Sequence, residues 1–581
     1  MIERLNARPV QLYSLFHIHI KERLKTLLNI GSTGTIQLSC GLLGSTLNVI
    51  QPQRKPPSVL NSMKTNIGLF LKKRAEICPN REAFVEFERN RRFTFAELNG
   101  RANRVANGLL DSGIRPGDRV TTLLKNGIEF VETYFAIAKI GAVMVPINWR
   151  LVAGEISYIL QNSGAKALVY DSDFDATVNS LQGGAQGELP LEQWIRRENS
   201  DTGTPDWAMD YDTFVGSFPP QEPPVGAWDD DNLFIMYTSG TTGRPKGVVH
   251  SHNGMLWSQL TSMSTSDMRD GDRWLLALPM FHVGCLSPTS LLVHRGGAGV
   301  IMRELEVGAM FRCIEQEKVT IFMAVPALLQ FMLAAPERDQ CDISSVRWIA
   351  TGAAPVPVSL LHEYEALGIS IFQAYGLTES CGPGTLLLPE DGEAKVGSCG
   401  RPQMHTEINI IDSDGNTIPM GSDQAGELLV GGRHLMKEYW NNPQATAETL
   451  IDGWLHTGDI CTWDAEGFVT ICDRMKDMII SGGENIYPAE LENILAACPE
   501  VQEAAVIGVA SQKWGETPLA LIVAAAGTAP TAESLKAYCK ENLAGYKVPQ
   551  LYELVDTLPR NPSGKLLKPE LRKQFPGPAP F

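Results

Sequence analysis

Helix-like and strand-like patterns alternate over most of this chain, from about residue 64 to residue 475, and this alternation limits the folds it can adopt. In the stretch 95–110, apolar residues recur on one helical face, at Leu98, Ala102, Val105 and Leu109. A short β-rich run at 120–123 follows that helix. Helices that alternate with short strands pack as layers on mostly parallel sheets. We therefore predict an α/β fold whose large N-terminal domain contains several subdomains.

The pattern changes after Asp473, where a compact unit of roughly 100 residues begins. Pro488 suits the first position of a helix that ends before Pro499. Thr531 is placed to cap a second helix, which should end at Gly545. Apolar runs predict strands at 478–480, 504–509 and 519–524. Together these elements predict a small α+β domain at the C-terminal end.

The N-terminal segment differs in composition from the rest of the chain. Its first sixty residues hold seven Lys and Arg but only two Asp and Glu. Such a segment is typical of a transit peptide, a membrane-surface helix or a flexible extension. Its uncharged run, 26–53, is broken by Ser, Thr, Asn, Gln and Gly, so we do not expect a transmembrane helix. The expected organisation is a flexible extension over 1–62, a main domain over 63–475 and a small mobile domain over 476–581.

A stretch rich in glycine and proline, 183–224, is predicted to be a surface loop. Arg196 and Arg197 lie within it, and two neighbouring basic residues can contact anionic lipid or remain solvated. Peripheral contact with a membrane is therefore one of the expectations.

Composition excludes some partners. The 66 Asp and Glu outnumber the 50 Lys and Arg, and the formal charge of −16 argues against a nucleic acid partner. The 11 cysteines include no C-x-x-C pair, and the histidine pairs 17 with 19 and 250 with 252 come without further ligands. We expect reduced thiols, no transition metal and a cytoplasmic location. The sequence does not indicate an oligomeric state.

The segment 237–247, YTSGTTGRPKG, lies between two apolar runs and carries the strongest chemical signal. Its glycines let the backbone approach a ligand closely, and its hydroxyls and backbone N–H groups can surround phosphate. Lys246 adds a positive point charge. The pattern is not the P-loop G-x-x-x-x-G-K-[ST], which the chain lacks, so an ordinary kinase or ATPase is not expected.

The same segment resembles the signature of the adenylate-forming, or AMP-binding, superfamily of acyl-CoA synthetases, peptide-synthetase adenylation domains and beetle luciferases. Further motifs follow in that family's order: PMFH at 279–282, GAAP at 352–355, YGLTE at 375–379, GWLHTGD at 453–459, DRMKD at 473–477, SGGE at 481–484 and NPSGK at 561–565. The runs 231–240 and 378–388 are most similar to fatty-acyl-CoA synthetases, in particular the mycobacterial long- and very-long-chain enzymes. The resemblance covers about residues 64–570 and implies an AMP-binding domain over 63–475 followed by a lid domain.

ATP, Mg²⁺ and coenzyme A are the cofactors and co-substrates that this resemblance implies. Pyrophosphate carries negative charge as it departs from the α-phosphorus. Cations and N–H donors should therefore surround the phosphates. The implied phosphate-binding residues are Thr238, Ser239, Gly240, Thr241, Thr242, Gly243 and Lys246. Glu379 is the implied Mg²⁺ ligand, since magnesium is often shared between a carboxylate and phosphate oxygens.

The nucleoside is implied to bind at the later motifs. Tyr375 can stack on adenine, and a buried core tyrosine is the alternative. The residues implied to surround it are Gly352, Ala353, Ala354, Gly376 and Thr378. Asp459 can accept hydrogen bonds from the ribose hydroxyls with Arg474 as a supporting cation, and a surface salt bridge is the alternative.

The C-terminal residues enter through the resemblance alone. Lys565 is implied to neutralise the carboxylate and the α-phosphate during adenylation, and it completes a catalytic set with Thr238, Lys246 and Glu379. Lys476 stands at the family's hinge position, about which the small domain rotates between the two reactions. The residues implied to approach coenzyme A are Ser481, Gly482, Gly483 and Lys547, of which Lys547 is equally well explained as a structural helix-end lysine.

The acid is predicted to have an uncharged tail. The resemblance implies that His282, Val283 and Gly284 line the acyl channel, and no acidic residue closely follows Phe281 to bind a substrate amine. We predict an ATP-dependent long-chain fatty acid–CoA ligase that acts through an acyl-adenylate. The alternatives are a ligase for aryl or medium-chain acids, a luciferase-like oxygenase and an enzyme that loads a separate carrier protein.

Overall fold

A computed structural model gives the fold of most of the chain. The described residues are 64–184, 187–198, 203–238, 245–352, 356, 358–392, 394–395, 397–474, 477–481, 484–511, 514–543, 545, 547–560 and 566–576. The N-terminal extension, and therefore the expectations about residues 1–62 and the run 26–53, lies outside them. No helix in the described part is long and apolar enough to span a membrane.

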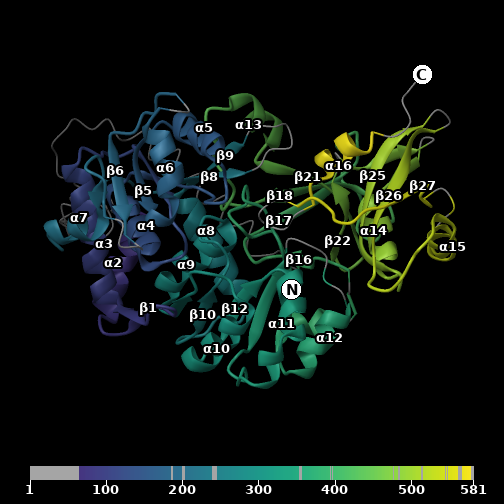
Figure 1. The fold of residues 1–581 in the computed structure, drawn as a ribbon, viewed down its shortest axis with the longest axis horizontal. Coiled ribbons are helices and arrows are strands. Elements are labelled where there is room, and N and C mark those ends of the chain that lie inside the picture. Colours follow the sequence, from purple (N-terminus) through teal and green to yellow (C-terminus); the bar gives the residue numbers. More distant parts are fainter. Residues whose placement is uncertain are drawn as a thin grey trace, which may run out of the picture. The chain divides into compact units, whose positions relative to one another are not determined.

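The first large sheet, sheet A, has a parallel centre and antiparallel edges. Several of its strands are seen in the lower half of Figure 1. Its described strands, in spatial order, are β16 (Arg401–Pro402), β15 (Thr385–Leu387), β14 (Ser370–Tyr375), β13 (Trp348–Gly352), β12 (Ile321–Ala324), β10 (Arg273–Leu276), β11 (Ala298–Ile301), β1 (Glu82–Glu86) and β2 (Arg91–Thr94). Strands β14 to β1 run parallel, whereas β2, β15 and β16 pair antiparallel. The carboxyl ends of these parallel strands therefore share one edge, where ligands bind in open α/β sheets.

The second large sheet, sheet B, combines a parallel part with an antiparallel hairpin. Its described strands are β19 (Glu438–Tyr439), β9 (Lys246–Ser251), β8 (Asn232–Thr238), β4 (Val143–Pro146), β3 (Arg119–Leu123), β5 (Ala165–Asp171), β6 (Gln193–Arg197) and β7 (Met209–Asp210). Strands β8 and β9 form an antiparallel hairpin in which Thr238 and Lys246, the described residues on either side of the glycine-rich segment in the sequence, face each other. The sheet thus holds both ends of the predicted phosphate loop in fixed register.

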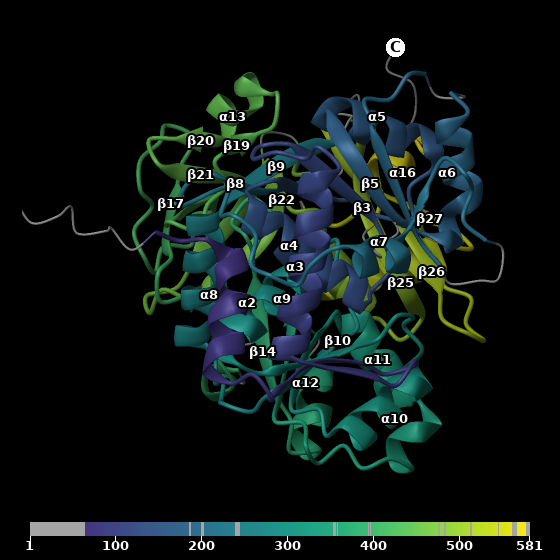
Figure 2. The ribbon, with the colours of Figure 1, turned by 90° about the vertical axis from the view of Figure 1, so that its left-hand side faces the viewer.

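Helices pack against both sheets. Those described in the N-terminal domain are α2 (Ile67–Ile77), α3 (Phe95–Asp111), α4 (Ile128–Ile140), α5 (Ala153–Ser163), α6 (Asp175–Gln182), α7 (Tyr211–Ser217), α8 (His252–Thr265), α9 (Val283–Arg295), α10 (Val307–Glu317), α11 (Pro326–Ala334), α12 (Val358–Ala366) and α13 (Pro443–Thr449). Helix α4 is buried at every position, and its three charged residues, Glu129, Glu132 and Lys139, are buried in ion pairs with Arg91, Arg101 and Glu222. It packs beside α2 and α3 (Figure 2), and the largest apolar core includes residues of all three.

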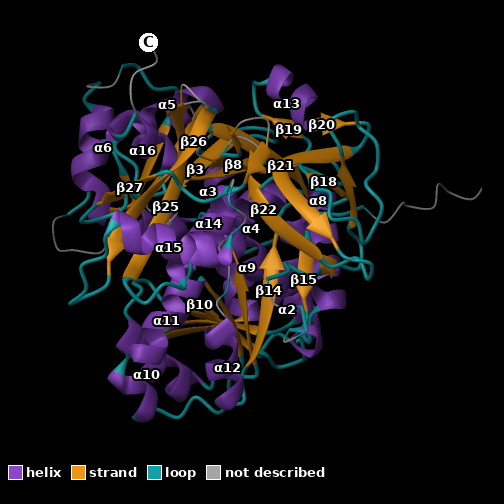
Figure 3. Ribbon diagram, turned by 90° about the vertical axis from the view of Figure 1, so that its right-hand side faces the viewer, coloured by secondary structure: helices purple, strands orange, loops and turns teal. Residues whose placement is uncertain are grey.

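Two smaller sheets follow in the sequence. Sheet C is antiparallel and contains β17 (Glu407–Ile411), β18 (Gly426–Gly431), β20 (Leu450–Ile451), β21 (Trp454–Trp463) and β22 (Val469–Arg474). The C-terminal unit contains sheet D, with β23 (Ile479–Ser481), β24 (Glu484–Ile486), β25 (Val501–Ser511), β26 (Gly515–Ala524) and β27 (Leu551–Leu554), and the helices α14 (Pro488–Ala496), α15 (Ala532–Asn542) and α16 (Lys568–Gln574). Figure 3 shows α14 and α15 beside the strands of sheet D, which they cover with an apolar core.

Most of the predicted elements are confirmed, as is the α/β fold class with a small C-terminal α+β unit. Helix α3 begins behind the Thr94 capping box and covers the predicted 95–110. Pro488 opens α14, and Thr531 caps α15, although α15 ends at Asn542 rather than at Gly545. Strands β25 and β26 extend beyond both predicted apolar runs.

The predicted surface loop over 183–224 is wrong, because β6, β7 and α7 lie within it. Strand β6 pairs with β5, and its two arginines are buried in ion pairs instead of facing solvent. The Arg196 guanidinium pairs with Asp175 and Glu198, and that of Arg197 pairs with Asp171 at 3.2 Å. These arginines are therefore not available for the expected contact with anionic lipid.

Candidate functional site

Glu379 lies in the loop between β14 and β15, beside the end of the β8–β9 hairpin. Its Oε1 accepts a hydrogen bond of 2.8 Å from Tyr439 Oη, and Tyr439 belongs to β19, which pairs with β9. Burial and the Glu379 carboxylate raise the pKa of Tyr439, so its hydroxyl stays protonated and donates. The Lys246 ammonium lies 4.8 Å from the centre of the Tyr439 ring. Two distant motifs, at 246 and 379, are thus brought together by a residue that the sequence did not single out.

Tyr375 and Asp459 form a second polar pair. Tyr375 ends β14 and is 9% exposed, and its Oη donates to Asp459 Oδ2 at 2.6 Å. Burial and the Asp459 carboxylate raise the pKa of this tyrosine well above its usual range. Gly352 lies next to the Tyr375 strand, where an added Cβ would lie 2.2 Å from the Ala374 oxygen, so a glycine is required. The backbone of Tyr375 therefore belongs to sheet A, whereas its side chain packs against residues of sheet C and its hydroxyl is fixed by Asp459.

Asp459 is held by its own strand. Its backbone N–H donates to Thr457 Oγ1 at 3.1 Å, and the Gly458 N–H donates to Glu427 Oε1 at 3.0 Å. Glu427 Oε2 lies 2.8 Å from His456 Nδ1. Asp459 faces Arg474 as its cross-strand partner on β22. The side chain of Arg474 lies outside the described residues.

The acyl-channel candidates surround the start of α9. His282 precedes the helix, Val283 and Gly284 are half-buried in its first turn, and Gly284 faces Met323 of β12. Burial and the nearby Arg150 lower the pKa of His282 to about 4, so the ring is neutral at physiological pH. Its Nε2 is buried and has no hydrogen-bond partner among the described residues.

An aromatic cluster adjoins this histidine. The Phe281 ring lies 4.4 Å from that of His282 and packs edge-on against Trp149 at 6.2 Å. The Arg150 guanidinium lies 4.0 Å from the Trp149 ring and 5.9 Å from Phe281, and it makes no ion pair with any described residue. Burial lowers the pKa of Arg150. The cluster therefore combines an apolar surface with one unpaired cation.

Several predicted site residues lie outside the described part, so their roles stay predictions. These are Ser239, Gly240, Thr241, Thr242, Gly243, Ala353, Ala354, Lys476, Gly482, Gly483 and Lys565. Of the described candidates in the C-terminal unit, Ser481 ends β23, and Lys547 Nζ pairs with Glu490 of α14 at 2.7 Å. That ion pair is the structural role that was the alternative for Lys547.

The site suits magnesium better than a metal that needs a protein cage. No group of three or more His, Cys, Asp or Glu side chains in the described residues is placed to hold a metal ion. Magnesium is usually bound by one or two carboxylates together with water and substrate phosphate oxygens. A single half-buried carboxylate at Glu379, near the ammonium of Lys246, fits that donor set.

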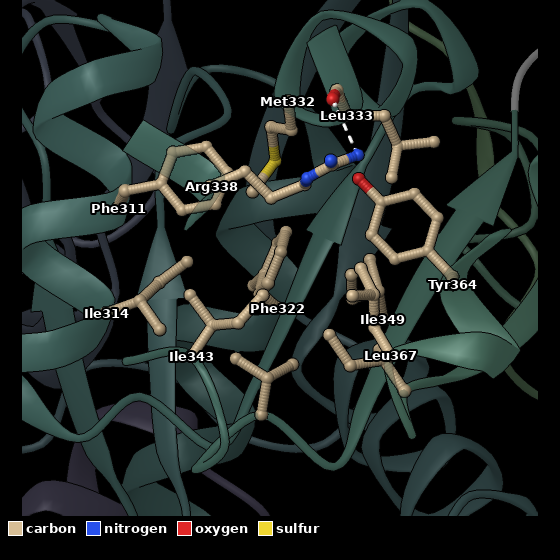
Figure 4. A pocket seen from close by; sticks show the side chains of 12 residues that line it. Phe311, Ile314, Phe322, Met332, Leu333, Arg338, Ile343, Ile349, Tyr364 and Leu367 are labelled. Carbon is tan, nitrogen blue, oxygen red and sulfur yellow. Dashed lines mark hydrogen bonds between the residues drawn. The ribbon is translucent and has the colours of Figure 1, made fainter. Parts of the chain in front are cut away.

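An apolar cavity lies away from these motifs, between sheet A and the helices α10, α11 and α12 (Figure 4). Phe311, Phe322 and Met332 line it, and its polar groups are already satisfied. Arg338 Nη1 donates to the Leu333 oxygen at 3.0 Å, and Tyr364 Oη donates to the Leu329 oxygen at 2.9 Å. We interpret it as a packing gap in the core, because no motif residue lines it.

Comparison with known proteins agrees with the motifs. Residues 71–440 match the family "AMP-binding enzyme", and residues 490–565 match "AMP-binding enzyme C-terminal domain". The chain is 42% identical to a long-chain-fatty-acid–CoA ligase of Mycobacterium tuberculosis, over 89% of this chain and 99% of that protein. It is 41% identical to a feruloyl-CoA synthase of Amycolatopsis, over 83% of this chain and 94% of that protein.

A solved structure agrees with the fold. It is the o-succinylbenzoate coenzyme A synthetase of Bacillus subtilis in complex with ATP and magnesium ion. The TM-score is 0.76 at 34% identity, over 87% of this chain and 99% of that chain. With the family match covering more than half of its residues, this chain belongs to the AMP-binding enzyme family.

Proposed function

We propose that this protein is an ATP- and Mg²⁺-dependent acid–CoA ligase that forms an acyl-adenylate and then an acyl-CoA. The observation that carries the proposal is the placement of two carboxylates on either side of one short segment. Tyr375 donates to Asp459, and Glu379, four residues later, accepts from Tyr439, whose ring lies 4.8 Å from the Lys246 ammonium. A nucleoside bound at the first pair would direct its phosphates toward the second.

In the first half-reaction, a carboxylate oxygen of the acid attacks the α-phosphorus of ATP and pyrophosphate leaves. Lys246 and Thr238, which face each other across the hairpin, would bind the phosphates, and preformed donors at developing charge are the largest catalytic term in many enzymes. Bound Mg²⁺ would neutralise phosphate charge and align the leaving group. Glu379 would hold that ion, with its carboxylate oriented by the hydroxyl of Tyr439.

Asp459 would bind the ribose. A carboxylate can accept about four hydrogen bonds, so the bond from Tyr375 is compatible with further bonds from ribose hydroxyls. Because Tyr375 and the Thr457 and Glu427 contacts fix this strand, the carboxylate would bind without first reorganising. Arg474 and the ring of Tyr375 keep the supporting roles that the family resemblance implies.

In the second half-reaction, the thiol sulfur of coenzyme A attacks the acyl carbonyl, the thiol proton is released and AMP leaves. By the resemblance, Lys565 acts in adenylation only, Lys476 is the hinge between the two arrangements, and Ser481, Gly482 and Gly483 approach coenzyme A. Lys565→Ala is expected to slow acyl-adenylate formation sharply and to spare the conversion of supplied acyl-adenylate. Equal losses in both half-reactions would contradict this role.

The proposed acid is a long-chain fatty acid. A neutral His282, the small residues Val283 and Gly284, and Met323 give the candidate channel a mainly apolar lining, with the Arg150 guanidinium nearby. The relative from Mycobacterium tuberculosis, a long-chain-fatty-acid–CoA ligase, supports the same class. An aryl acid is the second candidate, because the feruloyl-CoA synthase is almost equally similar.

A competition experiment separates these acids. The full chain is incubated with ATP, Mg²⁺ and coenzyme A together with short- to very-long-chain fatty acids, benzoate and a cinnamate, and thioesters are quantified by mass spectrometry. Mainly long-chain acyl-CoA is expected. If the products are mainly aryl or short-chain thioesters, the proposed long-chain substrate is wrong. Acyl-adenylate without any CoA thioester would point to a carrier protein or another acceptor.

A further inference from the structure

The loop that carries Glu379 is anchored from outside at four consecutive peptide groups. The carbonyl of Thr378 accepts from His250 Nε2 at 2.7 Å, and that of Glu379 accepts from the Met436 N–H at 2.7 Å. The carbonyl of Ser380 lies 2.9 Å from His434 Nδ1, and that of Cys381 accepts from Ser258 Oγ at 2.8 Å. The donors come from β9, from the chain between β18 and β19, and from α8. Three distant segments therefore fix one short loop.

Two of these donors are buried histidines whose tautomers follow from their acceptors. A carbonyl can only accept, so His250 must carry its proton on Nε2 and His434 on Nδ1. His434 Nε2 then accepts from Thr406 Oγ1 at 2.9 Å. Burial lowers the pKa of both rings to about 4, so each is a neutral donor at physiological pH.

His250 donates to the loop through Nε2, while its other ring nitrogen, Nδ1, stays without a partner among the described residues. The side chain is fully buried. An unsatisfied buried polar atom costs about 1–3 kcal/mol, so stability alone would favour an apolar residue here. A histidine at this place is better explained by what its Nε2 holds.

The loop makes turn hydrogen bonds of its own, from the Cys381 N–H to the Thr378 oxygen at 3.0 Å and from the Gly382 N–H to the Leu377 oxygen at 3.1 Å, but part of its backbone is strained. Cys381 has φ +56° and Gly382 has φ +109°, a region that side chains other than glycine rarely adopt. Gly376 passes so close to Gly382 that an added Cβ would lie 1.5 Å from the Gly382 oxygen. A backbone in such a sparsely populated conformation persists only when its surroundings determine it.

We infer that His250 and His434 are positioning residues that hold the Glu379 carboxylate in its metal-binding place through the carbonyls of Thr378 and Ser380. The inference rests on the proposed role of Glu379 in binding Mg²⁺. Neither histidine contacts the carboxylate, whose Oε1 bonds Tyr439. Loss of either histidine should therefore weaken Mg²⁺ binding without abolishing it.

The test measures how much Mg²⁺ strengthens ATP binding. Calorimetry gives the Kd of ATP for the full chain with and without Mg²⁺, in the absence of acid and coenzyme A, and the ratio of the two values is the metal effect. Loss of a group that orients a metal ligand typically weakens metal binding about 10–100-fold. His250→Leu is expected to reduce the metal effect about tenfold, and His250→Gln, which keeps a donor near the Nε2 position, should restore most of it.

Matched variants complete the design. His294→Leu removes another neutral histidine, half-buried and with its Nδ1 2.8 Å from Gln259 Oε1, and should leave the metal effect unchanged. Ser258→Ala removes only a hydroxyl and should reduce the metal effect about threefold, which keeps the inference testable if His250→Leu does not fold.

The outcomes separate this inference from the proposed function. If Glu379→Gln abolishes the metal effect but His250→Leu and Ser258→Ala keep it, the positioning role is wrong and the metal site stands. If Glu379→Gln keeps the full metal effect, the proposed metal ligand itself is wrong. Failure of His250→Gln to restore binding, or an equal loss in His294→Leu, would also overturn the positioning role.

Discussion

The two ends of the candidate site are built differently. Around Glu379 and Asp459, carboxylates and carbonyls have protein partners. Tyr439 donates to the Glu379 carboxylate, Tyr375 donates to the Asp459 carboxylate, and four carbonyls of the loop that carries Glu379 are anchored. Around His282, the ring Nε2 and the guanidinium of Arg150 have no polar side-chain partner among the described residues. Groups that are already held by protein partners suit a ligand that is always the same, and groups without such partners suit a ligand that varies. The comparison therefore separates a fixed nucleotide end from an adaptable acid end.

The largest expected effect tests the fixed end at its metal ligand. Glu379→Gln keeps the size of the side chain but removes its charge, so Mg²⁺ would lose its protein carboxylate. We expect kcat/KM for adenylation to fall by roughly 10²–10³-fold at limiting Mg²⁺. Pyrophosphate release at varied Mg²⁺ measures this loss. Wild-type rates at limiting Mg²⁺ would contradict the assignment.

A smaller effect is expected from the Tyr375–Asp459 hydrogen bond. Tyr375→Phe keeps the ring and frees the Asp459 carboxylate to rotate. Since one hydrogen bond to a charged group contributes about 1.5–3 kcal/mol, the KM for ATP should rise at least tenfold while the KM for the acid changes little. Initial rates with each substrate varied in turn would show this. Equal changes in both constants would mean that the pair does not belong to the nucleotide end.

The adaptable end should respond in selectivity. His282→Ala is expected to change the kcat/KM ratio between a long-chain acid and a cinnamate by roughly 10-fold, because a few methylene contacts differ by about 1–3 kcal/mol. The KM for ATP should stay as in the parent protein. Competition between the two acids, read as product ratios, measures the effect. An unchanged kcat/KM ratio together with a raised KM for ATP would mean that His282 belongs to the nucleotide end of the site.

The smallest effect concerns stability and pH at the same histidine. Its pKa is about 4 in the folded protein and near 6.5 when unfolded, so the unfolded chain binds the proton more readily. The contribution of the neutral ring is therefore present above pH 6.5 and is lost as the pH falls toward 4. Between pH 7 and pH 5, the free energy of unfolding should fall by about 2 kcal/mol more in the unsubstituted protein than in His282→Asn. Denaturant unfolding of both at each pH measures this difference, and parallel curves would contradict it.

The sequence predicted elements whose signals are local. Helix α3 follows from apolar spacing and the Thr94–Glu97 capping box, and α14 begins where Pro488 permits. The stretch 183–224 was predicted wrongly because β6 buries Arg196 and Arg197, so it lacks the apolar run by which buried strands are recognised.

The site was only partly predictable for a related reason. Motif residues such as Glu379 and Asp459 were found because the family resemblance names their positions. Tyr439, His434 and Ser258 lie 55 to 121 residues from Glu379 in the sequence, and a single polar residue at such a distance gives no pattern. Their role depends on the antiparallel β9–β19 pairing and on contacts between elements, which only the folded structure displays.

The most direct test of the proposed mechanism follows one reaction in two stages. The full chain is incubated with ATP, Mg²⁺ and a long-chain fatty acid without coenzyme A, the products are quantified by mass spectrometry, and coenzyme A is then added. We predict enzyme-bound acyl-adenylate and pyrophosphate in the first stage, and acyl-CoA with AMP in equal amounts in the second. Formation of ADP and phosphate, or acyl-CoA that appears without a preceding acyl-adenylate, would contradict the account.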